Sequence, residues 1–182
     1  MRTGGLVRVI AFLLSVPPAA GQGPVADRLR GRVPPEVAAA VERLAREAAA
    51  QGLPVEPLVQ KAVEGGAKGV PGPRVVAAVE ALAARLESAA RAVRAGGATP
   101  DPATIEAAAF VLSLGLGETQ VARLVQVGRP GRDRAVVLRV AGALVALGVP
   151  AGESVDLLVG ELEAGRPEAE LVDLPARVQA GL

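Results

Sequence analysis

The side chains able to do covalent chemistry are few in this sequence, and their types exclude several classes of enzyme. The chain contains no His, Cys, Tyr, Trp or Asn. A serine nucleophile needs a neighbouring base, usually His, so a Ser-His site is excluded. Metal sites built from His or Cys are excluded as well. We therefore expect no catalytic residue, no metal ligand and no cofactor site.

Carboxylates are the remaining catalytic groups, and a glycosidase can run on one or two of them. Sugar clefts usually offer aromatic platforms, whereas Phe110 is the one aromatic residue after residue 21. Because Phe110 lies in an Ala/Val/Leu-rich segment, we expect it in the core. The acids fall on the predicted polar faces of helices. An enzyme that uses carboxylates alone on a cell-envelope glycan is thus the alternative function.

Residues 65–73 form the one candidate binding segment. The sequence Gly-Gly-Ala-Lys-Gly-Val-Pro-Gly-Pro places one of the two lysines of the chain among four glycines and two prolines. A glycine-rich break before a helix can present backbone N–H groups to an anion. A flexible connection between helices is the other interpretation. If a ligand or protein partner binds here, the cations near it are Lys61, Lys68 and Arg74.

The first 21 residues have the pattern of a cleaved signal peptide. Arg2 and Arg8 precede an apolar run from Val9 to Val16, and small residues end the segment at Gly21. This pattern predicts cleavage before Gln22 and a periplasmic or secreted protein. The apolar run is too short to span a bilayer, which takes about 20 residues. The alternative is an ordinary disordered N-terminus.

Charge excludes nucleic acid as a partner and is unevenly spread. Without Arg2 and Arg8 the chain has 18 basic and 19 acidic residues, so it lacks the excess of positive charge that attracts nucleic acids. Residues 121–139 hold five arginines, and residues 151–182 hold seven acids. These are either two solvated helix faces or two patches that meet, within one molecule or between two. Near-neutral charge and the lack of Trp also argue against binding to a membrane surface.

Apolar residues recur at helical spacing throughout the chain, which predicts an all-α fold. Val37, Val41, Leu44 and Ala48 form one stripe, and a longer stripe follows residues 74–94. The segments 105–114 and 135–147 are apolar nearly all round, so we expect them to be the most buried helices. No segment alternates strictly enough to predict a strand.

Helix stops recur, and they suggest repeated helical hairpins. Each stop has the form Gly, an aliphatic residue, then Pro or Gly, which suits a helix C-terminus followed by a new start. The stops are Gly52-Leu53-Pro54, Gly69-Val70-Pro71, Gly115-Leu116-Gly117 and Gly148-Val149-Pro150. We predict a bundle or short solenoid-like array with units at 34–66, 102–130 and 131–167, although independent helices with similar turns give the same pattern.

This organisation predicts three parts. A signal peptide covers 1–21, a flexible or short-helix lead-in covers 22–33, and a single all-α domain covers 34–182, with a sub-boundary at 96–101.

The chain resembles uncharacterised exported Ala-rich, all-helical proteins of high-GC bacteria. The resemblance rests on Ala20-Gly21-Gln22-Gly23 and on residues 58–65 with the Lys68-Gly69 that follows. It implies export and a helical fold, and no activity. We therefore expect an exported, non-enzymatic interaction or structural module of the cell envelope. Its partner would be an unidentified envelope protein, and an oligomer is compatible with the pattern; stable membrane insertion is not expected.

Overall fold

The computed structural model describes residues 24–128 and 132–181, and all regular structure within these ranges is helical. The all-α prediction is confirmed. The predicted signal peptide lies outside the described residues. The helices are α1 (Val25–Leu29), α2 (Pro35–Ala50), α3 (Glu56–Ala67), α4 (Gly72–Ala95), α5 (Pro102–Ser113), α6 (Glu118–Val127), α7 (Arg134–Ala146), α8 (Ala151–Glu163), α9 (Glu168–Val172) and α10 (Leu174–Gly181).

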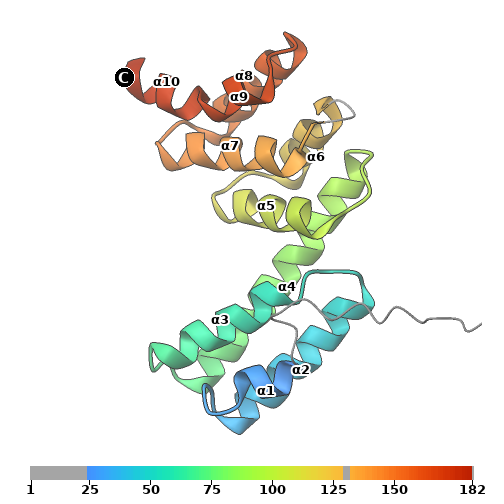
Figure 1. Cartoon of the computed structure of the whole chain (residues 1–182), viewed down its shortest axis with the longest axis vertical. Helices are drawn as coiled ribbons and strands as arrows, with labels where there is room; N and C mark the ends of the chain where they lie inside the picture. Colours follow the sequence, from blue (N-terminus) through green and yellow to red (C-terminus); the bar gives the residue numbers. More distant parts are fainter. Residues whose placement is uncertain (1–23, 129–131, 182) are drawn as a thin grey trace, which may run out of the picture.

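The helices form an elongated stack with α1, α2 and α3 at one end and α8, α9 and α10 at the other (Figure 1). One row runs through α2, α4, α6 and α8, each packed on the next. Beside it, α5 packs between α4 and α7, and α9 and α10 pack on α7. The 24-residue α4 reaches from the lower group of helices to the upper one and contacts α2, α3, α5 and α6. This helix therefore links the two ends of the molecule.

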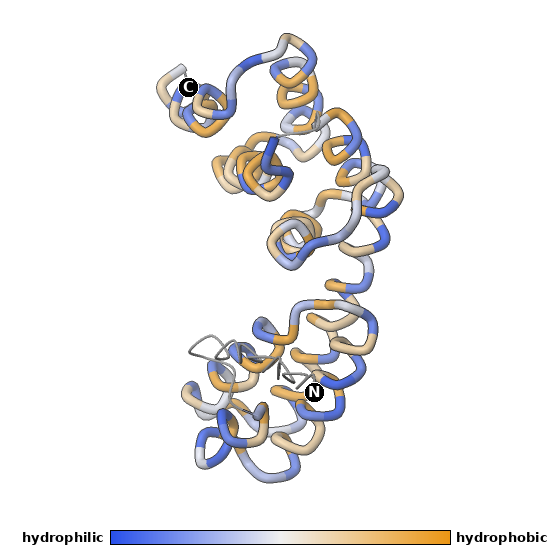
Figure 2. The backbone as a smooth tube through the Cα atoms, turned by 45° about the vertical axis from the view of Figure 1, so that its right-hand side comes forward, coloured by the Kyte–Doolittle hydropathy of each residue, from blue (hydrophilic) through white to orange (hydrophobic). Residues whose placement is uncertain are grey.

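The predicted apolar stripes form the core. Val37, Val41, Leu44 and Ala48 are all buried against the neighbours of α2. In Figure 2, hydrophobic and hydrophilic residues alternate along each helix with the helical period. As expected, α5 and α7 bury residues on most of their circumference. A single cluster of buried residues extends from Leu29 to Leu174, so one core runs through the stack.

The predicted helix stops are confirmed as left-handed glycine turns. The four glycines of these stops, Gly52, Gly69, Gly115 and Gly148, all have φ between +63° and +101°. Glycine adopts this left-handed region without strain, whereas other residues are strained there. After each glycine, the aliphatic residue donates its N–H back to the last helical turn, as the Val149 amide does to the Leu144 carbonyl at 3.1 Å. These bonds satisfy carbonyls that the helix end would otherwise leave unpaired.

The predicted break at Gly65-Gly66 is wrong, because α3 continues through both residues to Ala67. Close packing explains these glycines. A Cβ on Gly66 would lie 2.1 Å from the Arg32 carbonyl oxygen, and one on Gly65 would lie 2.8 Å from Val75 Cγ2. The glycines therefore let α3 approach its neighbours, and the turn itself begins at Lys68.

The segment 96–101 is packed against the stack. A Cβ on Gly96 would lie 2.6 Å from the Ala122 carbonyl oxygen, so this glycine lets the end of α4 meet α6. Asp101 caps α5, as the sequence predicts, by accepting hydrogen bonds from the Thr104 amide at 3.0 Å and the Thr104 hydroxyl at 2.5 Å. The core thus continues across the segment.

Candidate functional site

The three cations singled out in the sequence line one groove. Lys61 and Lys68 come from α3 and the turn after it, and Arg74 comes from the first turn of α4. The groove has a volume of about 260 Å³, and Val75 and Ala78 form its apolar floor. The antiparallel packing of α3 on α4 brings these residues together from positions up to 13 apart in the chain. Their role in binding a partner stays a prediction.

Glu64 pairs with both lysines of the groove. Its carboxylate lies 2.5 Å from Lys68 Nζ and 3.3 Å from Lys61 Nζ. The hydrogen bond from Lys68, reinforced by that from Lys61, lowers the pKa of Glu64 below its usual value. One acid therefore offsets part of the charge of two bases. Arg74 makes no ion pair with another residue of the described chain.

The first turn of α4 is poorly suited to an anion. Pro71 and Pro73 have no N–H to donate, and the Arg74 amide already donates to the Pro71 carbonyl at 2.9 Å. The positive groups available here are therefore side chains rather than backbone amides. This arrangement favours a ligand with carboxylates at several positions over a single small anion held by a helix end.

A second groove of about 280 Å³ continues the first along the same sides of α3 and α4. On α4, Arg74, Ala78, Leu82 and Arg85 share one face because they are spaced by four, four and three residues. On α3 the same holds for the lining residues at 57, 61, 64 and 68. We call the combined surface the α3–α5 groove; it is lined by Pro57, Lys61, Glu64, Lys68, Arg74, Ala78, Leu82, Arg85, Glu106, Phe110 and Ser113.

Phe110 lies in this groove, and the prediction that it belongs to the core is wrong. Its side chain is 47% exposed, although it is the one aromatic residue of the described chain. The faces of α5 that meet α4 and α7 carry small residues such as Ala107, Ala108 and Ala109, which allow close helix packing. A phenyl ring is too large for that contact. It therefore lies at the edge, beside Gly142 of α7.

The middle of α4 is the least covered part of that helix. Val79 and Leu86 are buried, whereas no residue from Glu80 to Arg85 is. Leu82 belongs to the predicted apolar stripe, yet it is only partly buried and lines the groove. The apolar stripe thus reaches the surface beside Pro57, at the start of α3, and beside Phe110 of α5.

Four basic and two acidic side chains line the α3–α5 groove. Lys61, Lys68 and Arg74 lie at one end, while Arg85 and Glu106 lie beside Phe110 at the other. Arg85 and Glu106 line the same groove without forming an ion pair within the described chain. The groove therefore combines an excess of positive charge with a half-exposed aromatic ring and a partly buried Leu.

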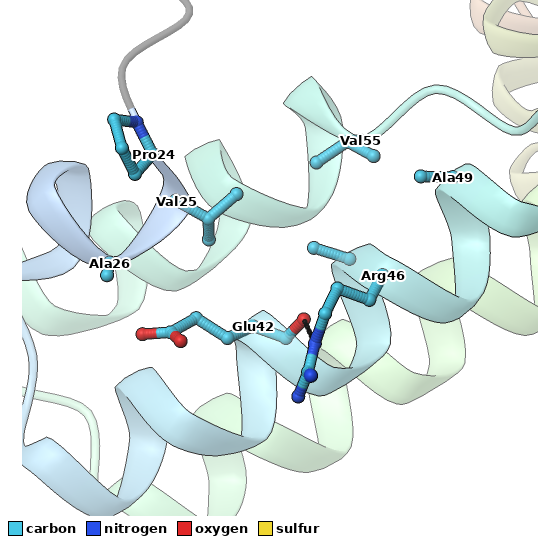
Figure 3. Close-up of a pocket in the computed structure, with 8 residues that line it drawn as sticks. Pro24, Val25, Ala26, Glu42, Arg46, Ala49 and Val55 are labelled. Atoms are coloured by element: carbon cyan, nitrogen blue, oxygen red, sulfur yellow. Dashed lines mark hydrogen bonds between the residues drawn. The ribbon is translucent and has the colours of Figure 1, made fainter.

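Another, more apolar groove lies between α1, α2 and the residue that precedes α3 (Figure 3). Val25, Ala45, Ala49 and Val55 line it, and its volume is about 300 Å³. Its polar contact is internal, because Arg46 Nε donates to the Glu42 carbonyl at 3.4 Å. Pro24 and Val25 form the wall of the groove on the side of α1.

The carboxylates do not gather in any groove that we describe. The α3–α5 groove has two, Glu64 and Glu106, which line separate parts of it, and the groove in Figure 3 has one, Glu42. Within residues 24–128 and 132–181, no group of three or more acidic side chains is placed to hold a metal ion. The same ranges contain no helix both long enough and apolar enough to cross a bilayer.

The arginine-rich segment 121–139 and the acidic segment 151–182 form one ion pair with each other within the described part of the chain. Arg123 of α6 and Asp156 of α8 form an ion pair at 2.7 Å. Of the other acids of α8, Glu161 pairs with Arg166 at 3.3 Å, whereas Glu153 and Glu163 make no ion pair within the described chain.

Comparison of the chain with protein-family models, with curated proteins and with solved structures gives no match.

Proposed function

We propose that this chain is an exported, non-enzymatic helical module that binds a protein partner through the α3–α5 groove. The observation that carries the proposal is the half-exposed Phe110 beside Leu82 in a groove with an excess of basic side chains. Aromatic residues with apolar neighbours and a charged rim are typical of the energetic centre of protein interfaces.

The residues that line the groove favour a protein over a small molecule. Its walls are helix surfaces whose backbone groups are already hydrogen-bonded, so they offer side-chain contacts alone. A partner helix satisfies its own backbone and can present apolar and acidic side chains together. The carboxylate-only enzyme remains the alternative; the two carboxylates of the groove, Glu64 and Glu106, line separate parts of it and give that alternative little support.

A crosslinking pull-down from cell-envelope extract tests the binding proposal, with residues 22–182 as bait. We expect a saturable partner that is captured by the wild-type protein and by Val172→Ala, which removes an equally exposed apolar side chain on α9. Phe110→Ala and the pair Lys68→Glu/Arg74→Glu should lose it while keeping the wild-type circular dichroism. Capture that is unchanged in both groove variants would contradict the proposal.

Export is tested separately by expressing the full chain in a bacterial host and sequencing the N-terminus of the protein in each cell fraction. The proposal predicts a mature protein that begins at Gln22 outside the cytoplasm. An intact Met1 in the cytoplasmic fraction alone would contradict it.

A further inference from the structure

We propose that the α3–α5 groove receives helix α8 of a second copy of this chain, so that molecules associate head to tail. The inference rests on the proposed function for the location of the binding surface. It adds the identity of one occupant. The argument uses the charges of the two ends of the molecule, the exposed face of α8 and the spacing of its residues.

The two ends of the molecule carry opposite net charge. Residues 24–100 contain eleven basic and eight acidic side chains, whereas residues 101–182 contain seven basic and eleven acidic ones. The part of the groove with Lys61, Lys68 and Arg74 lies in the first part of the chain and α8 in the second, in the lower and upper groups of helices in Figure 1. Opposite charges on opposite ends favour contact between the head of one molecule and the tail of the next.

Helix α8 is the last member of its row, and its outer face is uncovered. It packs on α6 and α7 through Val155, Leu158, Val159 and Leu162. The opposite face shows the exposed Leu157 one turn after Glu153, and Glu163 lies toward the edge of this face; neither acid forms an ion pair within the described chain. An apolar residue between two acids is the complement of the groove, where Leu82 lies between Arg85 and Arg74.

The spacing of the two helices matches to within one residue when α8 runs antiparallel to α4. At about 1.5 Å per residue, Glu153 and Glu163 are about 15 Å apart, and Arg85 and Arg74 are about 16 Å apart. With Glu153 opposite Arg85, Leu157 falls near Leu82 and the ring of Phe110. Glu163 then falls near Arg74.

The same register explains a glycine that the fold of one molecule does not require. Gly160 lies in the interior of α8, where glycine is unfavourable relative to alanine. A Cβ built on it would meet nothing within 4 Å in its own chain. In the proposed contact Gly160 lies opposite Ala78, so two small residues let the helices approach closely between the charged ends.

Sedimentation velocity of residues 22–182 over a wide range of concentration tests the inference. The groove and the α8 face are different surfaces, so the contact leaves one of each free and the assembly can grow beyond a dimer. We expect concentration-dependent species larger than a dimer at low salt, and weaker association at high salt. A protein that stays monomeric at every concentration would overturn the inference.

Two charge-reversed variants make the test specific. Arg74→Glu/Arg85→Glu reverses the groove, and Glu153→Arg/Glu163→Arg reverses the α8 face. Each alone should lower the association constant by about tenfold or more, because like charges then face each other. Mixing the two variants should restore association, since each reversed surface finds a complement on the other protein. Association that neither reversal weakens, or that mixing does not restore, would overturn the inference.

Arg30→Glu/Arg94→Glu is the matched control, because it changes the net charge equally at exposed positions outside the groove and should leave association unchanged. The result also separates the two proposals. A monomeric protein whose envelope partner is lost in Phe110→Ala would reject self-association and leave the binding function standing. Self-association without a captured envelope partner would support the contact between copies and reject the binding of a different protein.

Discussion

The ring of Phe110 lies against Gly142, so that a Cβ on Gly142 would be 2.6 Å from Phe110 Cε1 and 3.1 Å from Cδ1. Glycine inside a helix such as α7 is unfavourable by about 1 kcal/mol relative to alanine. The glycine therefore carries a cost in helix stability, and in return the aromatic ring keeps its place at the edge of the groove.

A double-mutant cycle tests this relationship. In the wild-type background, we expect Gly142→Ala to stabilise the protein by less than the difference in helix propensity between glycine and alanine, because the ring must move aside. In the Phe110→Ala background the same change should stabilise the protein by about 1 kcal/mol. Urea unfolding of the four proteins gives the coupling free energy. Equal effects of Gly142→Ala in both backgrounds would show that the ring does not depend on the glycine.

Gly66 is the position where we expect the largest loss of stability from the addition of one methyl group. Gly66→Ala places a Cβ against the Arg32 carbonyl and Val33, and backbone atoms cannot rotate away. A destabilisation of about 1–3 kcal/mol follows from such overpacking. Gly160→Ala is the control, because its Cβ meets no atom of its own chain and should stabilise the monomer by up to about 1 kcal/mol. Thermal unfolding at low protein concentration compares the two, and equal shifts of the midpoint would refute the packing argument.

Asp101 should make the stability of α5 depend on pH. Burial raises the pKa of its carboxyl, but the hydrogen bonds from the Thr104 hydroxyl and from backbone amides outweigh it, so the pKa is lower than its ordinary value of 3.8. The cap therefore contributes fully above the unfolded-state pKa, and its contribution is lost as the pH falls through the folded-state pKa. Asp101→Ala should cost about 1 kcal/mol at pH 7.

The difference between Asp101→Ala and wild type should shrink when urea unfolding is repeated under acidic conditions. Thr104→Val serves as a comparison, since it removes the hydroxyl donor and keeps the backbone amide that Asp101 accepts from. A difference that is the same at every pH would mean that the charge of Asp101 contributes nothing.

Glu64 should weaken the binding of an acidic surface to the groove, because it neutralises part of the charge of Lys61 and Lys68. We expect Glu64→Gln to raise the self-association constant a few-fold at low salt, with the gain removed by high salt. Glu80→Gln is the control: Glu80 is an exposed acid of α4 that does not line the groove. Sedimentation velocity measures both variants, and a larger gain from Glu80→Gln would contradict this role.

Periodicity and turn chemistry were enough to predict much of the fold. The stripe from Val37 to Ala48 and the helix stops at Gly52 and Gly148 are local features, and local physics decides them. Gly65 and Gly66 were misinterpreted because glycine marks both turns and close contacts. The atoms that require glycine there, Val75 and the Arg32 carbonyl, lie on other elements.

The candidate site was predicted only in part. Lys61, Lys68 and Arg74 stand out by composition, and the hairpin of α3 and α4 brings them together. Phe110 was assigned to the core because its neighbours in sequence are apolar. Its exposure depends on how closely the alanines of α5 let that helix approach α4 and α7, which no pattern within α5 reveals. The partly buried Leu82 depends on the same long-range packing.

The uncovered middle of α4 also has a mechanical meaning. Between Val79 and Leu86 this helix, which links the two ends of the stack, has no buried side chain of its own. We expect a bending load along the molecule to deform these six residues first, because deformation there disturbs no buried side chain of α4. A helix bound in the α3–α5 groove would pack against these residues and hold them straight. An assembly of such molecules would therefore resist bending more than a single molecule does.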